Sequence, residues 1–329
     1  MIDFIGDIHG HCDELRALLK KLGYEETAGA FRYPGGGRKV VFLGDYIDRG
    51  GQVRETVNLV RAMRDAGSAT ALMGNHEFNA LCFWQRNGCG EGHFIKGIPG
   101  GYLREHSFNK VAIHARTVES YRGRQQEFRE VLDFFKTLPF YLETDLFRAQ
   151  HACFDGELLK LLQAEGVGSF ADGNFDELIA RACDEHNEYG DSLFAPLDCF
   201  LKGPEMPLPE GMTFQDGEGV VRKKVRLRWW IDPAQATLQD IALQPGVEFK
   251  ALDLPQQIRQ RRFYGEGERP VFFGHYWLKG EPALIRKNVC CLDYSIGSFY
   301  GHGRMVAYRF DGEQELDARK FVWVEGSSV

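Results

Sequence analysis

Over the first eighty residues, short apolar runs alternate with amphipathic segments of helical period. Residues 2–5, 39–43 and 69–73 are mostly apolar and each is followed by glycine, which is typical of buried strands. Residues 12–22 and 53–66 place leucine, valine and methionine on one stripe at helical spacing, which predicts two helices. Strand, polar turn and helix thus follow one another repeatedly. This order predicts a parallel sheet whose polar turns share one edge.

The pattern is less regular beyond residue 80. Glycines concentrate in residues 88–101, which predicts a loop, and three prolines in residues 202–211 predict an extended or looped segment. Residues 213–215 and 220–230 flank a polar, glycine-containing turn and predict a β-hairpin. Further helices are expected at 125–135, 157–163 and 176–185, and further strands at 141–143, 146–150, 271–273, 289–293 and 305–310.

Composition narrows the class of protein without identifying it. Of the 329 residues, 43% are hydrophobic and 26% charged, as is usual for soluble globular proteins. The formal net charge of −7 argues against a broad basic face for nucleic acid or anionic lipid. No stretch approaches the ~18 apolar residues of a membrane span. The eight cysteines include no CxxC pair, so we expect reduced thiols in a cytoplasmic protein that binds neither nucleic acid nor membrane.

The candidate chemistry lies in the polar side chains that follow the predicted strands. They offer oxygen and nitrogen donors and no thiolate, and this mixture suits Mn, Fe or Zn better than a structural zinc site. A lone histidine after a strand is more often a buried, hydrogen-bonded residue, and a lone aspartate is more often a helix cap. The hypothesis of a metal site rests on the repeated occurrence of such residues after successive strands. The residues are Asp7, His9, Asp45, Asn75, His76, His151 and His275.

A glycine stands immediately before four of these residues: Asp7, Asp45, Asn75 and His275. Glycine allows a sharp turn and a close approach of the backbone to a ligand. Two further charged residues, Asp48 and Arg49, follow in the turn after residues 39–43. A turn with only a structural role rarely needs so much charge at the end of a buried strand, where open α/β sheets build their sites.

Three motifs in this order resemble the calcineurin-like metallophosphoesterases: Gly6-Asp7-Ile8-His9-Gly10, Gly44-Asp45-Tyr46-Ile47-Asp48-Arg49-Gly50 and Gly74-Asn75-His76-Glu77. The middle motif, GDxxDRG, is similar to that of the bacterial phosphoprotein phosphatase branch. Later matches are looser. They are His151, Gly274-His275, the Trp-x-Asp-Pro segment within 227–233, and residues 291–297. The family usually has glycines after the histidine that corresponds to His151, whereas this chain has Ala-Cys-Phe.

The resemblance implies one catalytic domain over residues 1–329, with insertions at about 82–130 and 155–226. The implied fold is a four-layer αββα sandwich, in which two mixed β-sheets are flanked by helices. The implied cofactor is a pair of metal ions, most simply Mn, with Fe or Zn as alternatives. Asp7 and His9 would bind one metal, Asn75, His151 and His275 the other, and Asp45 would bridge the two.

The implied reaction is hydrolysis of a phosphate monoester by a hydroxide that bridges the two metals, as in serine/threonine protein phosphatases. Arg49 would bind the phosphate, His76 would protonate the leaving group, and Asp48 would orient His76. Many metallophosphoesterases end in Gly-His-x-His, and the second histidine binds the first metal. Here Trp277 stands at that position, so the first metal is expected to be more exposed and more easily lost.

The motifs are compatible with two further functions. The same motifs occur in enzymes that hydrolyse dinucleoside polyphosphates, and a metal-free binding module on a phosphatase scaffold is a third hypothesis. Basic residues alternate with apolar ones over 222–228, which predicts a strand with one basic face. That face is either solvated or a docking surface for an anionic substrate. The substrate, the native metal pair and the oligomeric state are not predicted.

Overall fold

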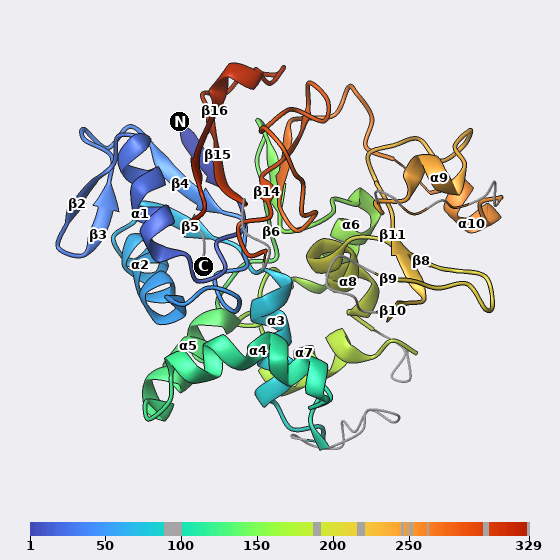
Figure 1. Cartoon of the computed structure of the whole chain (residues 1–329), viewed down its shortest axis with the longest axis horizontal. Helices are drawn as coiled ribbons and strands as arrows, with labels where there is room; N and C mark the ends of the chain where they lie inside the picture. Colours follow the sequence, from blue (N-terminus) through green and yellow to red (C-terminus); the bar gives the residue numbers. More distant parts are fainter. Residues whose placement is uncertain are drawn as a thin grey trace.

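Two mixed β-sheets pack face to face in the computed structural model, and helices lie outside them (Figure 1). The structure describes residues 1–88, 101–186, 192–215, 221–244, 247, 249, 253–261, 263–298 and 303–327. The arrangement agrees with the predicted sandwich of two mixed sheets flanked by helices. Within the described ranges, no helix is long and apolar enough to cross a membrane.

The larger sheet has six strands in the order β14-β15-β1-β4-β5, with β16 also paired to β15. The strands β1, β4 and β5 run parallel, while β15 is antiparallel to β1. The predicted parallel arrangement of the first three strands is therefore confirmed. The bounds are β1 Ile2–Ile5, β4 Lys39–Phe42, β5 Ala69–Ala71, β14 Asp293–Tyr294, β15 Arg304–Phe310 and β16 Phe321–Glu325.

The smaller sheet has the order β13-β12-β7-β6. Its β12 runs parallel to both β7 and β13, and β6 is antiparallel to β7. These strands are β6 Tyr141–Glu143, β7 Arg148–Gln150, β12 Val271–Phe273 and β13 Val289–Cys291. Three two-stranded pairs also lie within the described residues: β2 Glu25–Thr27 with β3 Ala30–Arg32, β8 Glu205–Pro207 with β11 Lys224–Arg226, and β9 Phe214–Gln215 with β10 Val221–Arg222.

The space between the two sheets is filled by apolar side chains from both. Phe4 of β1 stacks on Phe272 of β12, with ring centroids 3.8 Å apart. Val41, Leu43 and Ala149 belong to the same buried cluster. Because both sheets contribute every second residue to this layer, the alternate residues face the helices. The two sheets are thereby held with the carboxyl ends of β1, β4, β7 and β12 near one another.

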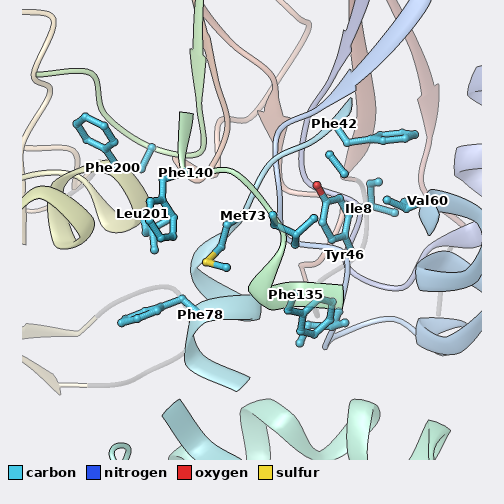
Figure 2. Close-up of a cluster of buried hydrophobic side chains, with 14 of the residues drawn as sticks. Ile8, Phe42, Tyr46, Val60, Met73, Phe78, Phe135, Phe140, Phe200 and Leu201 are labelled. Atoms are coloured by element: carbon cyan, nitrogen blue, oxygen red, sulfur yellow. The ribbon is translucent and has the colours of Figure 1, made fainter. Parts of the chain in front are cut away.

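Helices cover the outer faces of both sheets. The helices α1 Cys12–Lys21 and α2 Val53–Asp65 contact the six-stranded sheet, and α8 Phe194–Lys202 places Phe200 against Tyr141 of β6. A second apolar cluster fills this outer layer, with Phe42, Tyr46 and Phe135 among its members (Figure 2). The other helices are α3 Asn75–Trp84, α4 Phe108–Ser120, α5 Gln125–Lys136, α6 Gly156–Glu165, α7 Phe175–Cys183, α9 Leu238–Ile241, α10 Gln256–Arg259 and the short η2 Ala318–Lys320.

The predicted extents of one hairpin and one strand are wrong. The hairpin predicted at 213–230 is limited to β9 and β10, because the chain bends at Lys223 and β11 pairs with β8 instead. There is consequently no single strand with a basic face over 222–228. The strand predicted at 289–293 is divided, since β13 belongs to the four-stranded sheet and β14 to the six-stranded one. The loop predicted at 88–101 lies almost entirely outside the described residues.

Candidate active site

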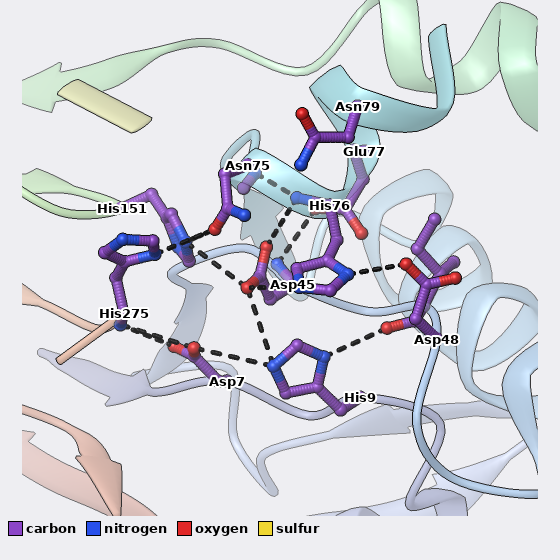
Figure 3. A network of polar contacts seen from close by, with 12 residues as sticks. Asp7, His9, Asp45, Asp48, Asn75, His76, Glu77, Asn79, His151 and His275 are labelled. Carbon is purple, nitrogen blue, oxygen red and sulfur yellow. Dashed lines mark hydrogen bonds and ion pairs between the residues drawn. The ribbon is translucent and has the colours of Figure 1, made fainter. Parts of the chain in front are cut away.

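The polar residues that follow five strands meet at one edge of the sandwich (Figure 3). Asp7, Asp45 and Asn75 come after β1, β4 and β5, whose parallel order brings their carboxyl ends together. His151 and His275 come after β7 and β12 of the other sheet. All five side chains lie in one group with His9 and His76, most of them buried. The two sheets therefore contribute to a single cluster of metal-type donors.

Glycine is required before two of these residues because the chains approach too closely for a side chain. A Cβ at Gly74 would lie 2.2 Å from Oδ1 of Asp45, and a Cβ at Gly274 would lie 2.0 Å from Oδ1 of Asp7. Real Cβ atoms do not come so near another atom. The glycines noticed in the sequence thus permit the approach of strand ends that brings the donors together.

Replacing Gly274 by alanine is expected to displace the Asp7 carboxylate and to lower metal affinity by roughly ten- to hundredfold, the usual effect of disturbing a ligand's support. Isothermal titration with Mn²⁺ measures this loss. Gly51→Ala is the matched control, because no atom lies within 4 Å of a Cβ at Gly51. Equal Mn²⁺ affinity in the two variants would contradict the proposed role of Gly274.

Left-handed backbone is concentrated at the same place. Positive φ angles in residues other than glycine cost free energy and persist where the surrounding structure enforces them, most often at functional sites. Eight such residues occur among the described residues, and six belong to or adjoin this cluster. They are His9 (φ 49°), Asp45 (55°), Asp48 (66°), Arg49 (63°), His275 (69°) and Trp277 (50°).

The first group of donors is built on His9. Its Nδ1 lies 3.0 Å from the carbonyl oxygen of Ile47 and donates to it, so the neutral ring presents a lone pair at Nε2. That Nε2 lies 3.6 Å from Oδ2 of Asp45 and 3.9 Å from Oδ2 of Asp7. Burial and the neighbouring His76 lower the pKa of His9 to about 3, so the ring stays neutral. Nε2 is buried without a hydrogen-bond partner among the described residues.

The second group is built on His151. Its Nδ1 donates to the carbonyl oxygen of Leu43 over 2.8 Å, which leaves a lone pair at Nε2 when the ring is neutral. Nε2 faces two oxygen acceptors, Oδ1 of Asn75 at 2.9 Å and Oδ2 of Asp45 at 3.4 Å. Nδ1 of His275 lies 2.8 Å from the same Asn75 oxygen. The tautomer of each ring decides whether these nitrogens donate a hydrogen to the oxygens or direct a lone pair toward them.

These two groups fit metal ions. When the rings are deprotonated on the side that faces the cluster, the lone pairs of nitrogen and oxygen repel one another unless a cation lies among them. The carbonyl oxygens of Ile47 and Leu43 hold the two histidine rings in the tautomer that a metal requires. Asp45 contributes its Oδ2 to both groups. The residues could therefore hold two cations that share one carboxylate.

The electrostatics of the two aspartates differ. Burial raises the pKa of Asp45, but without a metal the protonated imidazoles of His151 and His76 outweigh burial and hold the pKa of Asp45 well below its usual range. Asp45 in turn raises the pKa of His151 against the effect of burial, so a metal ion bound here would take the place of the proton at Nε2. Burial raises the pKa of Asp7 well above its usual range, and the nearby carboxylates of Asp293 and Asp45 add to this effect. A cation beside Asp7 would offset that repulsion. Sequence reasoning treated residue 293 only as part of a closing strand.

Glu77 is a second carboxylate whose contribution was missed. Its side chain is fully buried and accepts three backbone N–H groups, from Asp45 at 2.9 Å, Tyr46 at 2.8 Å and Gly74 at 3.0 Å. These bonds tie the turn after β4 to the start of α3. Glu77 therefore fixes the relative positions of Asp45 and Asn75, which lie on those two segments.

His76 points its two ring nitrogens in different directions. Nδ1 lies 2.5 Å from Oδ2 of Asp48 and donates to it, while Nε2 lies 3.9 Å from Oδ2 of Asp45 (Figure 3). Burial disfavours the charged ring, but Asp45 and Asp48 together raise the pKa of His76. Burial likewise disfavours a charged Asp48, whereas bonds from His114 and His76 hold its pKa well below the usual range. The charged Asp48 carboxylate therefore stabilises a proton on the His76 ring.

Two arginines lie beside the donor groups. The guanidinium of Arg49 lies 4.9 Å from the ring centre of Trp277, a cation–π contact that restricts its position. Arg226 of β11 donates to the carbonyl oxygen of His275 over 3.4 Å, and its charge contributes, after burial, to lowering the pKa of His275. The sequence flagged Arg226 only as one member of a basic stretch. The structure places it next to a candidate metal ligand.

Geometry alone leaves one role undecided. His9, Asp45 and His76 offer ligand atoms within 4.8 Å of one another, as do Asp45, His151 and His275. His76 thus lies near enough to be a ligand, whereas the family resemblance implies Asp7 as the partner of His9. The carboxylates of Asp45 and Asp48 raise the pKa of His76 against the effect of burial, and a ring that holds its proton suits the role of acid. A hydrogen bond from Nδ1 to a carboxylate also occurs on metal-binding histidines, so the metal content of a His76 variant decides between the two roles.

Comparison with known proteins gives relatives over part of the chain. The asymmetrical bis(5'-nucleosyl)-tetraphosphatase PrpE of Geobacillus sp. (strain WCH70) is 48% identical over 75 residues, which are 23% of this chain and 30% of that protein. The protein of the same name from Bacillus velezensis is 40% identical over 139 residues, 42% of this chain and 50% of that protein. The chain thus spans about a third to a half of the length of these relatives.

Among solved structures, the cold-active protein-tyrosine phosphatase of a psychrophilic Shewanella species is 18% identical, with a TM-score of 0.47 over 96% of this chain and 79% of that chain. A sequence model described as calcineurin-like phosphoesterase matches residues 1–195. The matched range is more than half of the 329 residues. It contains the strand ends that carry Asp7, Asp45, Asn75 and His151. The chain therefore belongs to the calcineurin-like phosphoesterase family.

Proposed function

We propose that this protein hydrolyses phosphate esters, with monoesters as the preferred class, at a centre that holds two metal ions. The observation that carries the proposal is the convergence of nitrogen and oxygen lone pairs on both sides of the Asp45 carboxylate. Such a shared carboxylate between two histidine-containing groups is suited to a pair of cations. Residues 1–329 would form one catalytic domain.

The proposed ligands of the first centre are Asp7, His9 and Asp45, and those of the second are Asp45, Asn75, His151 and His275. Three imidazoles favour Mn, Fe or Zn over Mg, and Mn is the first choice. When bound, two such ions supply charge stabilisation for the reacting phosphoryl group and lower the pKa of water. Trp277, in place of a further histidine, leaves the first centre with one ligand fewer.

The protein's own residues would bind the phosphate and handle the proton. Arg49, restrained by Trp277, presents a planar fork of donors to phosphate oxygens. Arg226 adds a second positive charge next to His275. His76, fixed by Asp48 and aimed with Nε2 toward Asp45, would give its proton to the departing alkoxide. Phosphate binding is thus assigned to the two arginines by their charge and position, and proton donation to His76 by its bond to Asp48.

The leading substrate is a phosphate monoester, in particular phosphoserine or phosphothreonine in a protein. A monoester dianion presents three free oxygens to the arginines and cations, whereas a diester presents two and carries one charge less. In a site where electrostatic stabilisation is the main contribution, the lost charge should slow hydrolysis. The GDxxDRG motif with Asp48 and Arg49 supports the same class.

Dinucleoside tetraphosphates are the second candidate. The observation in their favour is that the relatives described above are named bis(5'-nucleosyl)-tetraphosphatases. A polyphosphate chain needs positive charge beyond the reacting phosphoryl group. Arg226 is placed to supply it, although its contact with Glu205 at 3.8 Å reduces its net charge effect.

Steady-state kcat/KM on four substrates tests the proposal and decides between the candidates. The panel is a phosphoserine peptide, a dinucleoside tetraphosphate, an aryl monoester and an aryl diester, each with added Mn²⁺. We expect both monoesters to be hydrolysed faster than the diester, by roughly tenfold or more. A tetraphosphate that exceeds the peptide by about a hundredfold, equal to 2.7 kcal/mol of transition-state stabilisation, would make it the substrate.

The same panel separates an enzyme from a binding module. A metal-loaded protein that binds phosphate but turns over none of the four substrates would contradict the proposed hydrolase. Metal content is measured in parallel, so that an inactive preparation without metal is not mistaken for an inactive protein. Excess EDTA should abolish turnover, and Mn²⁺ should restore it better than Mg²⁺.

A further inference from the structure

Helix α4 has an unusual distribution of buried residues. In its thirteen residues, Phe108–Ser120, only His114 and Thr117 are buried, and both are polar. The apolar residues Phe108, Val111 and Val118 are exposed, with 86% of the Phe108 side chain accessible. An ordinary surface helix buries its apolar stripe instead. What α4 presents to the rest of the protein is therefore a pair of hydrogen-bonding side chains one turn apart.

Both buried side chains bond to Asp48. Nδ1 of His114 lies 2.9 Å from Oδ1 of Asp48, and the Thr117 hydroxyl donates to the same oxygen over 2.5 Å. The Thr117 oxygen also accepts the backbone N–H of Asp48, at 3.1 Å. Asp48 is 2% exposed and has a left-handed φ of 66°. Thr117 therefore holds this strained residue from both its backbone and its side chain.

The direction of the His114 bond is settled by a third residue. The indole Nε1–H of Trp84, at the end of α3, donates to Nε2 of His114 over 3.1 Å. Indole nitrogen can only donate, so Nε2 of His114 must be the acceptor and Nδ1 must carry the hydrogen. His114 thus donates to Asp48. Rings of Phe83 and Phe128 flank His114, with centroids 5.2 and 6.4 Å away, and keep it in place.

The two carboxylate oxygens of Asp48 therefore accept hydrogen bonds from different residues. Oδ1 receives the hydrogens of His114 and Thr117, and Oδ2 receives the hydrogen of His76 Nδ1. A carboxylate with one bonded oxygen can rotate about its side-chain torsions. With Oδ1 held by two donors from α4, rotation would break both bonds, so Oδ2 stays directed at His76.

We propose that His114 and Thr117 are positioning residues that act through Asp48 on His76. They keep Nε2 of His76 directed toward the leaving group, and α4, from the segment 82–130, is in this sense part of the active site. The inference rests on the proposed function, in which His76 gives a proton to the leaving group. It adds a chain of four residues, Trp84, His114, Asp48 and His76, that reaches from the surface of α3 to that proton.

A positioning effect on proton transfer has a signature that general destabilisation lacks. Protonation matters most when the leaving group is a strong base, such as a serine alkoxide, and least for a phenolate whose conjugate acid has a pKa of about 10 or lower. Misdirection of His76 should therefore slow hydrolysis of an alkyl phosphate more than hydrolysis of an aryl phosphate. Damage to the metal centres or to folding should slow both alike.

Three variants of the two residues test this. Thr117→Val removes the hydroxyl at nearly constant volume, and His114→Phe keeps a ring but removes both nitrogens. His114→Asn places an amide N–H near the position of Nδ1 and should restore part of the function. Thr56→Val is the matched control, because Thr56 is a fully buried helical threonine on α2 whose hydroxyl has no hydrogen-bond partner among the described residues.

The first readout is kcat/KM on serine phosphate in a peptide and on nitrophenyl phosphate, at equal metal content. We expect Thr117→Val and His114→Phe to lose roughly ten- to hundredfold on the peptide, the usual range for an outer partner of a functional group, and less than about threefold on the aryl ester. Thr56→Val should change neither rate, and His114→Asn should recover most of the loss on the peptide.

The second readout does not depend on turnover or on metal. In metal-free protein labelled with nitrogen-15 in histidine, the ring N–H of His76 bonded to Asp48 should give a far-downfield proton signal. The signal should persist in Thr56→Val and should shift upfield or vanish in Thr117→Val and His114→Phe. If wild-type protein hydrolysed neither ester, the proposed function would fail, and a signal that responded in this way would still support the positioning.

An unchanged His76 signal in both Thr117→Val and His114→Phe would overturn the inference. Equal losses of kcat/KM on the peptide and on the aryl ester would also overturn it, because they would assign His114 and Thr117 a purely structural role.

Discussion

Replacing Asp45 by asparagine is expected to remove metal from both centres and to lower turnover by roughly 10³-fold or more, since both ions stabilise the same reaction. Oδ2 of Asp45 lies 3.4 Å from Nε2 of His151 and 3.6 Å from Nε2 of His9. It is the only atom placed to serve both groups within the described cluster. A neutral amide at this position loses the charge that two cations share.

The measurement is metal content per chain after dialysis, together with kcat at saturating Mn²⁺. Asp3→Asn is the control, because Asp3 is a fully buried aspartate on the same strand as the Asp7 turn but bonds to Arg38 and Tyr24 instead of the site. Loss of metal in Asp45→Asn with normal content in Asp3→Asn is the expected pair of results. An Asp45→Asn protein that retained two metals would show that Asp45 is not the shared ligand.

Replacing His76 by alanine should produce the second large effect, a fall in kcat of roughly 10²–10⁴-fold, the usual contribution of a general acid. Metal content should remain as in the wild type. The structural reason is the 2.5 Å bond from Nδ1 to Asp48, which leaves Nε2 to carry a transferable proton. Loss of metal from this variant would make His76 a ligand, a role that its distance from His9 and Asp45 also permits.

The leaving group provides a finer test of the same variant. If His76 protonates the departing oxygen, His76→Ala should retain relatively more activity on an aryl ester than on a phosphoserine peptide, because a phenolate needs less help. Asp45→Asn should show no such preference. Equal losses in His76→Ala on the two substrates would indicate that His76 positions the phosphate and transfers no proton.

Much of the fold could be predicted because the site stands at strand ends. The apolar runs at β1, β4 and β5 are short and each precedes a glycine, and glycine there is required by contacts such as that between Gly74 and Asp45. The same short motifs therefore indicate both the sharp backbone turns and the polar side chains of the site. The side chains brought together at the sheet edge are the ones that the sequence singled out, and their individual roles remain proposals.

The contribution of α4 could not be predicted from periodicity. Pattern analysis assumes that buried positions are apolar, whereas α4 buries His114 and Thr117 and exposes Phe108 and Val111. Its sequence therefore carries no recognisable stripe. His114 has no ligand spacing in the sequence, and its bond to Asp48 is a long-range contact across 66 positions. Only the three-dimensional arrangement reveals it.

The basic strand was mispredicted for a different reason. Alternation of charged and apolar residues over 222–228 continues across the bend at Lys223, so period-two patterning indicated one strand where there are two. Val225 of β11 is buried and pairs with Met206 of β8. This pairing takes the place of the predicted pairing of β11 within the hairpin. Competition between partners for a strand is a tertiary effect and leaves no local signal. Asp293 and Glu77 likewise leave no local signal, because they accept backbone N–H groups. Asp293 accepts those of Trp277 and Ser295, and Glu77 accepts the three described above.

The most direct test of the two-metal centre is a crystal structure of the Mn²⁺-loaded protein with anomalous scattering recorded at an X-ray energy above the manganese absorption edge and again below it. Two edge-dependent peaks are expected on either side of Asp45, one between Asp7 and His9 and the other among Asn75, His151 and His275. A single peak, or a peak coordinated by His76 in place of Asp7, would contradict the assignment of the two centres.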